Sequence, residues 1–208
     1  MGRLEPIALE GRYARLEPLT PRHIPRLLAA AQEPRDSFSL TTVPSDEAET
    51  TDYVAGLLRA HADGKALPFA TVDRETGRVV GATRFLNVEF WKWPPGSPRQ
   101  RGADVPDVVE IGGTWLAPSV QRTGINTEAK LLMLTHAFET WRVHRVSLLT
   151  DARNTRSRAA ILRLGARFDG VLRANRVASD GGIRDTAAYS IVEGEWPEVK
   201  AGLLSKLR

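Results

Sequence analysis

The segment Gln121–Thr127, with the sequence QRTGINT, has residues suited to holding an anion against the backbone. It follows a run typical of a buried strand and precedes a stretch that predicts a long helix. The first N–H groups of a helix have no partner inside it, and with the helix dipole they attract phosphate. Gly124 can adopt a positive φ and lacks a Cβ, and Asn126 or Thr127 can cap the helix. We therefore expect a phosphate-binding turn, although an ordinary strand-to-helix turn has the same pattern.

Residues 121–126, QRTGIN, are similar to the pyrophosphate loop Q/R-x-x-G-x-G/A of the GNAT superfamily of acyl-CoA-dependent N-acyltransferases, with Asn126 where Gly or Ala is usual. The stretch TGINTEAKLLML, followed by HAFETWRVHRVSLLTDARNTRSRAAILRLGARFDGVLR, resembles the RimJ/RimL-like branch over most of the C-terminal half. The resemblance implies that acetyl-CoA is the acyl donor and that no metal is needed. The residues that it assigns to the cofactor are Trp115, Leu116, Gln121, Arg122, Thr123, Gly124, Ile125, Asn126, Thr127, Asn154 and Ser157.

Two further residues are candidates for the chemistry. Glu110 stands in an otherwise apolar strand, at a point where several GNAT enzymes carry a glutamate. An ammonium group must lose a proton before its nitrogen can attack a thioester, so the reaction needs a general base. Partial burial raises the pKa of a carboxyl group toward a value useful for that role. The resemblance also places Ser157 near the sulfur of the leaving thiolate, where a hydroxyl can stabilise the developing charge. The alternatives stay open: Glu110 can form an ion pair with an arginine, and Ser157 can serve only the helix start.

The composition limits the classes of function. The chain has 208 residues, which suits one domain at 1–208, and its 42% apolar content can build a sizeable core. The absence of cysteine excludes disulfides, thiolate metal ligands and a cysteine nucleophile. No apolar run is long enough for a membrane helix or a signal peptide, which predicts a cytoplasmic protein. The net charge of +4 suits an anionic cofactor as well as RNA, and no basic run with interleaved aromatics indicates direct nucleic-acid binding.

The expected elements alternate between strands and helices. Apolar periodicity and turn signals predict strands at 14–19, 67–73, 78–90, 108–116, 145–151, 168–177 and 184–192, and helices at 23–31, 127–141, 154–164 and 196–208. A further helix is expected through 53–58, with the acidic residues 46, 47 and 49 in its first turns. Asp36–Asp46 and Trp91–Asp107 have neither period and are expected to be loops. The strand, helix and strand across 108–151 predict a right-handed crossover between two parallel strands.

These features predict a mixed α/β fold of the GNAT type, with a mostly antiparallel sheet, one central parallel pair and helices on both faces. The expected activity is transfer of an acetyl group from acetyl-CoA to a primary amine by direct attack in a ternary complex. The amine can belong to a protein N-terminus, a peptide or a small molecule, and the protein can be a monomer or a homodimer. Two alternatives remain: a non-catalytic acyl-CoA-binding protein on the same fold, and an RNA-associated module supported only by charge.

Overall fold

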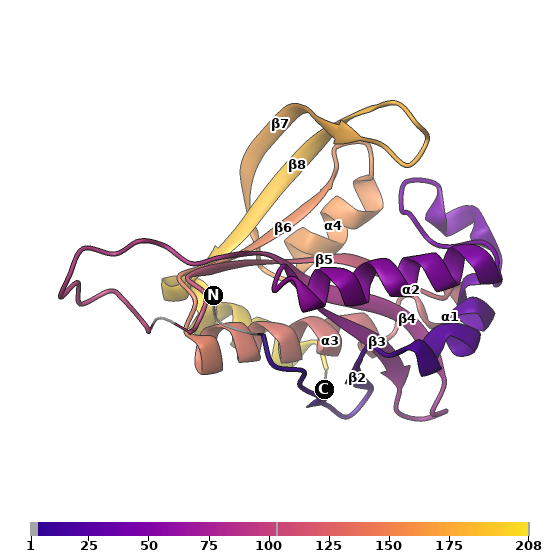
Figure 1. Ribbon diagram of the computed structural model, residues 1–208, viewed down its shortest axis with the longest axis horizontal. Helices are drawn as coiled ribbons and strands as arrows, with labels where there is room; N and C mark the ends of the chain where they lie inside the picture. Colours follow the sequence, from indigo (N-terminus) through magenta and orange to yellow (C-terminus); the bar gives the residue numbers. More distant parts are fainter. Residues whose placement is uncertain (1–3, 103, 208) are drawn as a thin grey trace.

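The computed structural model describes residues 4–102 and 104–207, and an eight-stranded sheet organises them. The strand order is β1-β2-β3-β4-β5-β6-β8-β7, and every neighbouring pair is antiparallel except β5 and β6. The strands are β1 (Leu9–Glu10), β2 (Ala14–Pro18), β3 (Ala66–Asp73), β4 (Val79–Glu89), β5 (Val108–Leu116), β6 (Arg145–Asp151), β7 (Arg167–Val177) and β8 (Ile183–Val192). The predicted fold class, with its single parallel pair, is confirmed (Figure 1).

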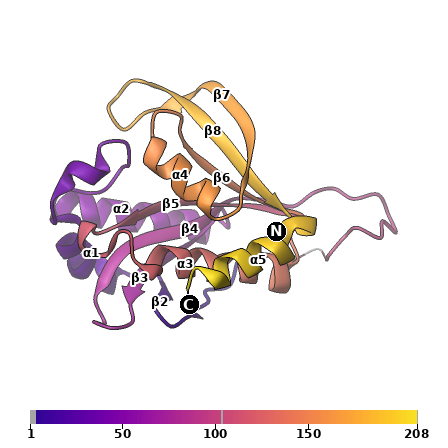
Figure 2. The same ribbon diagram turned by 180° about the vertical axis from the view of Figure 1, so that it is seen from behind.

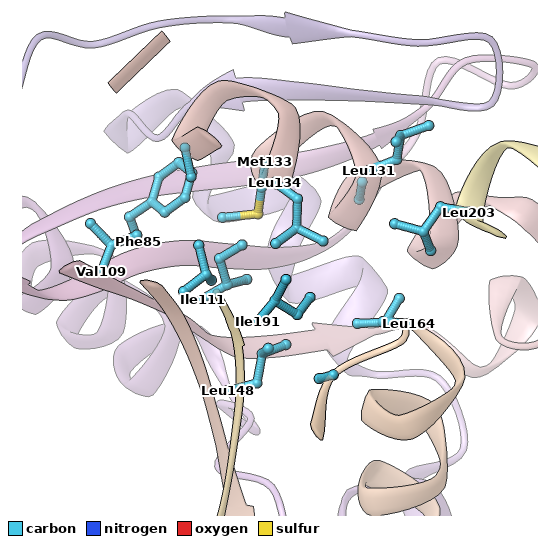
Figure 3. Close-up of a cluster of buried hydrophobic side chains, with 14 of the residues drawn as sticks. Phe85, Val109, Ile111, Leu131, Met133, Leu134, Leu148, Leu164, Ile191 and Leu203 are labelled. Atoms are coloured by element: carbon cyan, nitrogen blue, oxygen red, sulfur yellow. The ribbon is translucent and has the colours of Figure 1, made fainter. Parts of the chain in front are cut away.

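Helices cover both faces of this sheet, as Figures 1 and 2 show from opposite sides. The helices are α1 (Ile24–Ala31), α2 (Glu47–Ala62), α3 (Gly124–Thr135), α4 (Thr155–Arg163) and α5 (Trp196–Ser205). One buried cluster joins α1 and α2 to the sheet, and a larger one joins α3, α4 and α5 to the opposite face. In the larger cluster Val109 and Ile111 of β5 pack beside Met133 and Leu134 of α3 (Figure 3). The side chain between those two β5 residues, Glu110, therefore points to the face of α1 and α2.

Most element boundaries follow the sequence patterns, and β5 and β6 match their predicted ranges. The predicted start of the long helix is wrong, because α3 begins at Gly124 and Thr123 is its N-cap, with Thr123 Oγ1 accepting from the N–H of Ile125 at 3.3 Å. Neither Asn126 nor Thr127 caps this helix. Its last predicted turns, His136–Trp141, form a separate π-helical segment. The second helix begins at Glu47 after the N-cap Asp46, which confirms the expected acidic first turn, and it continues past Leu58 to Ala62.

The segment Trp91–Asp107 has no helix or strand among its described residues, as expected, and it projects from the sheet between β4 and β5 (Figure 1). Asp36–Asp46 is also mostly irregular, with one 3-10 turn at Arg35–Phe38. Asp36–Asp46 contributes residues to the lining of the large cavity described below, whereas Trp91–Asp107 leads directly into the start of β5.

Candidate active site

The two parallel strands separate partway along their length. β5 pairs with β6 only at Val108–Arg145, Val109–Val146 and Glu110–Ser147. Beyond Glu110, β5 continues to Leu116 and β6 to Asp151, but no pairing joins them. The splay leaves one edge of Ile111–Leu116 without a strand partner, and backbone groups on that edge can bond a ligand.

A bulge shapes β5 at the start of the splay. The β4–β5 register shifts between Ala82 and Arg84, where Gly113 and Thr114 lie opposite the single residue Thr83. Gly113 has a φ of 57°, and a Cβ there would lie 2.6 Å from the guanidinium carbon of Arg84. A Cβ on Gly112 would lie 2.8 Å from Oε1 of Glu110. A side chain at either position would push aside Arg84 or Glu110, and at Gly113 it would also have to adopt the left-handed conformation, so both positions favour glycine.

The turn at the start of α3, which the sequence predicts to bind an anion, has a different backbone from the expected one. Arg122, not Gly124, has the left-handed conformation, with a φ of 63°. Gly124 is needed because the ring of Tyr13 packs over it, so that a Cβ would lie 3.2 Å from Tyr13 Cδ2. Arg122, Thr123 and Asn126 of this turn line a cavity. The first N–H groups of a helix have no partner inside it, and here Thr123 Oγ1 takes that of Ile125.

Gln121 has a structural role beside its place in the cavity wall. Its side-chain amide donates to the carbonyl of Leu116 at 2.8 Å and to Ser37 Oγ at 3.0 Å. It thus fastens the segment after α1 to the end of β5. The side chains of Ile125 and Thr127 are buried and do not line the cavity, so only backbone groups at these two positions can reach a ligand.

The start of α4 lies across the splay from α3. Asn154 is the predicted N-cap, and its Oδ1 accepts from the N–H of Ser157 at 2.9 Å. Both side chains line the cavity. Two helix N-termini therefore converge on one space, which favours a ligand with several negative charges.

The cavity between these elements has a volume of about 900 Å³, within the range of small-molecule sites. Cationic side chains outnumber acidic ones along its wall. The cations are Arg84, Arg122, Lys130, Arg156, Arg163, Arg176 and Arg184, and the acids are Asp52, Glu110 and Asp151. All the predicted cofactor residues except Gly124, Ile125 and Thr127 line it. Its size, its charge and its free strand edge fit a long anionic cofactor such as an acyl-CoA.

Glu110 lies at the point where the strands part, and its side chain is buried, with 4% exposed. Burial raises the pKa of its carboxyl, and a 2.6 Å hydrogen bond donated by Asn87 Nδ2 offsets part of that rise. The positive charges of three arginines also lower this pKa from farther away: Arg176, Arg84 and Arg184. Asn87 itself has a φ of 47° at an irregularity of β4, which turns its amide toward the carboxylate.

A second cavity of about 440 Å³ adjoins the first, and Glu110 and Leu149 line both. Its acidic residues are Glu89, Glu110 and Asp169, and its one cation, Arg145, forms an ion pair with Asp169 at 2.8 Å. This cavity therefore suits a cationic or neutral polar group more than an anion. A carboxylate between a cationic and an acidic cavity can exchange protons with molecules in both.

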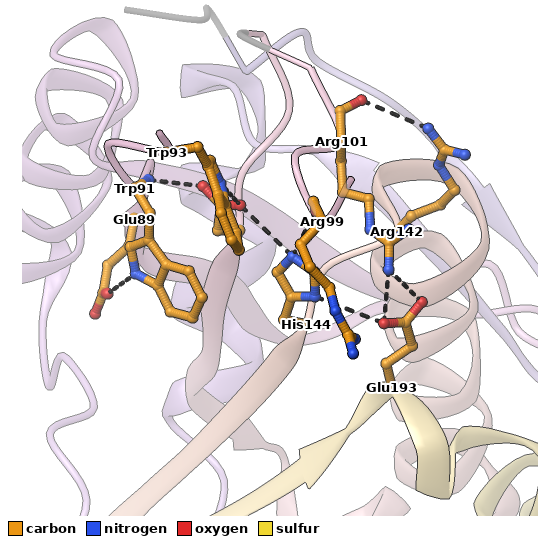
Figure 4. Close-up of polar contacts among 9 residues, drawn as sticks. Glu89, Trp91, Trp93, Arg99, Arg101, Arg142, His144 and Glu193 are labelled. Atoms are coloured by element: carbon orange, nitrogen blue, oxygen red, sulfur yellow. Dashed lines mark hydrogen bonds and ion pairs between the residues drawn. The ribbon is translucent and has the colours of Figure 1, made fainter. Parts of the chain in front are cut away.

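The base of the Trp91–Asp107 segment is held by aromatic and ionic contacts (Figure 4). Asp107 accepts from the backbone N–H of Trp91 at 2.6 Å and from the indole of Trp93 at 2.7 Å. The Trp91 ring stacks on the His144 ring, and their centroids lie 5.7 Å apart. Neither tryptophan lines the two cavities described above. The tryptophans anchor the segment, and only Trp91, 45% exposed, has a large free apolar surface.

The chain matches a family model described as an acetyltransferase (GNAT) domain over residues 14–167, which is more than half of its length. The protein therefore belongs to the GNAT acetyltransferase family. The GNAT fold is also that of a GCN5-related N-acetyltransferase from Brucella melitensis, with 29% identity, a TM-score of 0.82 and coverage of 99% of this chain and 87% of the other. Mycobacterium smegmatis RimJ in complex with CoA-disulfide shares 25% identity with a TM-score of 0.75, covering 99% of this chain and 97% of the other.

A curated Bacillus subtilis protein named "Putative ribosomal N-acetyltransferase YdaF" is 32% identical over 84 residues, or 40% of this chain. The match spans 45% of that relative's length. The GNAT family uses acetyl-CoA as the acyl donor. In the described part of the chain no helix is long and apolar enough to cross a membrane, and no cluster of three metal-ligating side chains is present.

Three residues of this GNAT site have no counterpart in the sequence prediction. They are Asn87, which bonds Glu110, Tyr53, whose hydroxyl accepts from the Trp115 indole at 3.2 Å, and Lys130. Asn87 and Tyr53 lie in regular elements whose patterns gave no sign of a polar role. Lys130 alone carried a signal, because it is a charged residue within the apolar stretch AKLLML.

Proposed function

We propose that the protein transfers an acetyl group from acetyl-CoA to a primary amine, with Glu110 as the general base. The observation that carries the proposal is the position of Glu110 between the two cavities. The larger, cationic cavity suits acetyl-CoA, with its phosphates at the starts of α3 and α4. The smaller, acidic cavity suits the approaching amine.

In the proposed reaction the amine nitrogen attacks the thioester carbonyl, a C–N bond forms and the C–S bond breaks. Glu110 accepts the proton that the amine loses, directly or through a water molecule. The raised pKa of its carboxyl suits this transfer near neutral pH. The coenzyme leaves as a thiolate, and the proposed role of the Ser157 hydroxyl is to donate a hydrogen bond or a proton to the sulfur; its position in the cavity lining at the start of α4 supports this role.

The transfer is proposed to be direct, in a complex that holds both substrates. The chain has no cysteine to carry the acyl group, and the two cavities meet at Glu110. A serine acyl-enzyme is the competing route. Initial rates at several concentrations of each substrate distinguish the two, because a ternary complex gives intersecting reciprocal plots and an acyl-enzyme gives parallel ones.

The acceptor is proposed to be the N-terminal amine of a protein or peptide. Two observations support an acceptor that extends beyond one small molecule: the open acidic cavity beside Glu110, and the anchored Trp91–Asp107 segment that projects from the same end of β4 and β5. The name of YdaF, a putative ribosomal N-acetyltransferase, agrees with a ribosomal protein as a candidate. Polyamines and other small amines are the alternative.

The test measures thiol release with a disulfide reagent, which reads only the coenzyme because the protein has no cysteine. N-terminal peptides, free amino acids and polyamines are compared as acceptors. Glu110→Gln keeps the shape of the side chain but not the ionisable group, so kcat/KM should fall about 100-fold or more while CoA binding persists. Ser157→Ala should lower kcat/KM by a smaller factor, because a water molecule can replace the hydroxyl. An unchanged pH profile in Glu110→Gln would move the base to another group.

A further inference from the structure

Lys130 is a buried amine on the wall of the cofactor cavity, and the proposed mechanism does not use it. Its side chain is 5% exposed. Its Nζ donates to Thr114 Oγ1 at 2.6 Å and to Thr83 Oγ1 at 3.0 Å, and the two hydroxyls lie 2.8 Å apart. These neutral partners tie α3 to β4 and β5 at the bulge, where Thr114 lies opposite Thr83. Burial lowers the pKa of Lys130 to about 7.

No carboxylate in the described part of the chain forms an ion pair with this amine. Glu128, on the same helix, is occupied by the backbone N–H groups of residues 12–14. On β4 and β5 the charged neighbours are Arg84 and Glu110, which point to the opposite face of the sheet. The other titratable residues on elements that pack against α3 are Glu10, Tyr13, Arg15, Glu17, His136, Glu139, Glu198, Lys200 and Lys206, and none of them bonds Lys130.

A buried amine without a counterion is ready to respond to charge that enters its cavity. Lys130 lies six residues after Gly124, which is about 9 Å along a helix axis. Phosphates at the start of α3 would therefore lie close enough to favour the protonated amine, because charge interactions in a partly buried site are weakly screened.

We infer that Lys130 takes up a proton from solvent when the anionic cofactor binds, which links cofactor affinity to pH. The inference rests on the proposed acyl-CoA site. Between about 0.5 and 1 proton should be taken up per cofactor at pH 8, and the Kd should rise about tenfold between pH 6.5 and 8.5. The linkage would tighten cofactor binding as the pH falls, opposite to the effect of a base that must be ionised.

The test is titration calorimetry with dephospho-CoA at pH 8, in two buffers whose ionisation enthalpies differ. This probe keeps the diphosphate but lacks the 3′-phosphate, which would itself titrate. The buffer dependence of the measured enthalpy gives the number of protons taken up. Lys130→Met, of similar length and apolar, should bind with no uptake. Lys130→Arg, which stays charged throughout this pH range, should also abolish it.

Glu110 is the other buried titratable group of the cavity, so Glu110→Gln is the matched control. This variant should still take up a proton when dephospho-CoA binds. Binding by the wild type without proton uptake overturns the inference and leaves the acyl-CoA assignment intact. Uptake that persists in both Lys130 variants also overturns it. Failure of the wild type to bind dephospho-CoA, CoA or acetyl-CoA overturns the inference together with the proposed function.

Discussion

Replacing Asn87 with glycine should move the acid limb of the pH–rate profile to higher pH by about one unit. Asn87 Nδ2 donates to Glu110 at 2.6 Å, and a hydrogen bond to a charged group contributes about 1.5–3 kcal/mol. At about 1.4 kcal/mol per pKa unit, its loss would raise the pKa of Glu110 by roughly one to two units. Asn87 is at the exposed end of β4, so water replaces part of the bond and the lower figure applies.

The acid limb should move to higher pH because Glu110 works as a carboxylate. Glu110 must be ionised to accept a proton, so activity is lost as the pH falls through its pKa. Burial has already raised that pKa, and Asn87 is the main group that holds it down. Without this donor, the loss should begin at higher pH, while the rate at high pH stays near that of the wild type.

Glycine is the appropriate replacement because the backbone of Asn87 has a φ of 47°. Glycine adopts that conformation without strain, whereas alanine would confound the loss of the amide with a backbone change. The assay is kcat/KM from pH 5.5 to 9.5, followed by the loss of thioester absorbance. An acid limb that stays in place in a folded, active Asn87→Gly enzyme would refute the assignment of Glu110 as the base.

Three further predictions concern the scaffold around the site. Glu128→Ala leaves the three backbone donors of residues 12–14 without their acceptor, so the free energy of unfolding should fall by about 3–5 kcal/mol in denaturant titrations, and Glu128→Gln should cost less. Gly124→Val crowds the ring of Tyr13, so CoA affinity should fall at least about tenfold; equal affinity in a folded variant would remove this turn from the site. Shortening the 94–104 loop should reduce peptide acetylation and spare CoA binding; activity confined to small amines, or peptide activity indifferent to the deletion, would contradict a peptide acceptor.

Much of the fold was predictable because its signals are local. Strand β5 is mostly apolar and buried, β6 alternates between buried and half-buried residues, and turn signals flank both, so their ranges were predicted without error. Asn154 was recognisable as an N-cap because Asn before a helical pattern has few other roles. The boundary of α3 was missed because Thr123, Asn126 and Thr127 are all acceptable caps, and only tertiary packing selects among them.

Most of the residues that the sequence assigns to the cofactor do line the large cavity, because they belong to recognisable local motifs. The hydrogen bond to Glu110 could not be predicted in this way. A glutamate in an apolar strand is visible in the sequence, but its hydrogen-bond donor belongs to β4, 23 residues away. Which residue of β4 faces Glu110 depends on the register shift between Leu86 and Glu89. Since a shift of one residue moves every side chain to the other face, no periodicity argument could have identified Asn87.

The backbone conformations that shape the site show the same limit more sharply. The sequence drew attention to Gly124, but the left-handed residues beside the cavity include Arg122 and Asn87, which are not glycines. Such positions cost energy and persist only when surrounding contacts fix them. At Asn87 the contact is the carboxylate of Glu110, so the strained residue and the proposed base position each other. This mutual dependence is why Asn87→Gly, which removes the amide and tolerates the backbone, is a sharper test of the mechanism than a change at Glu110 alone.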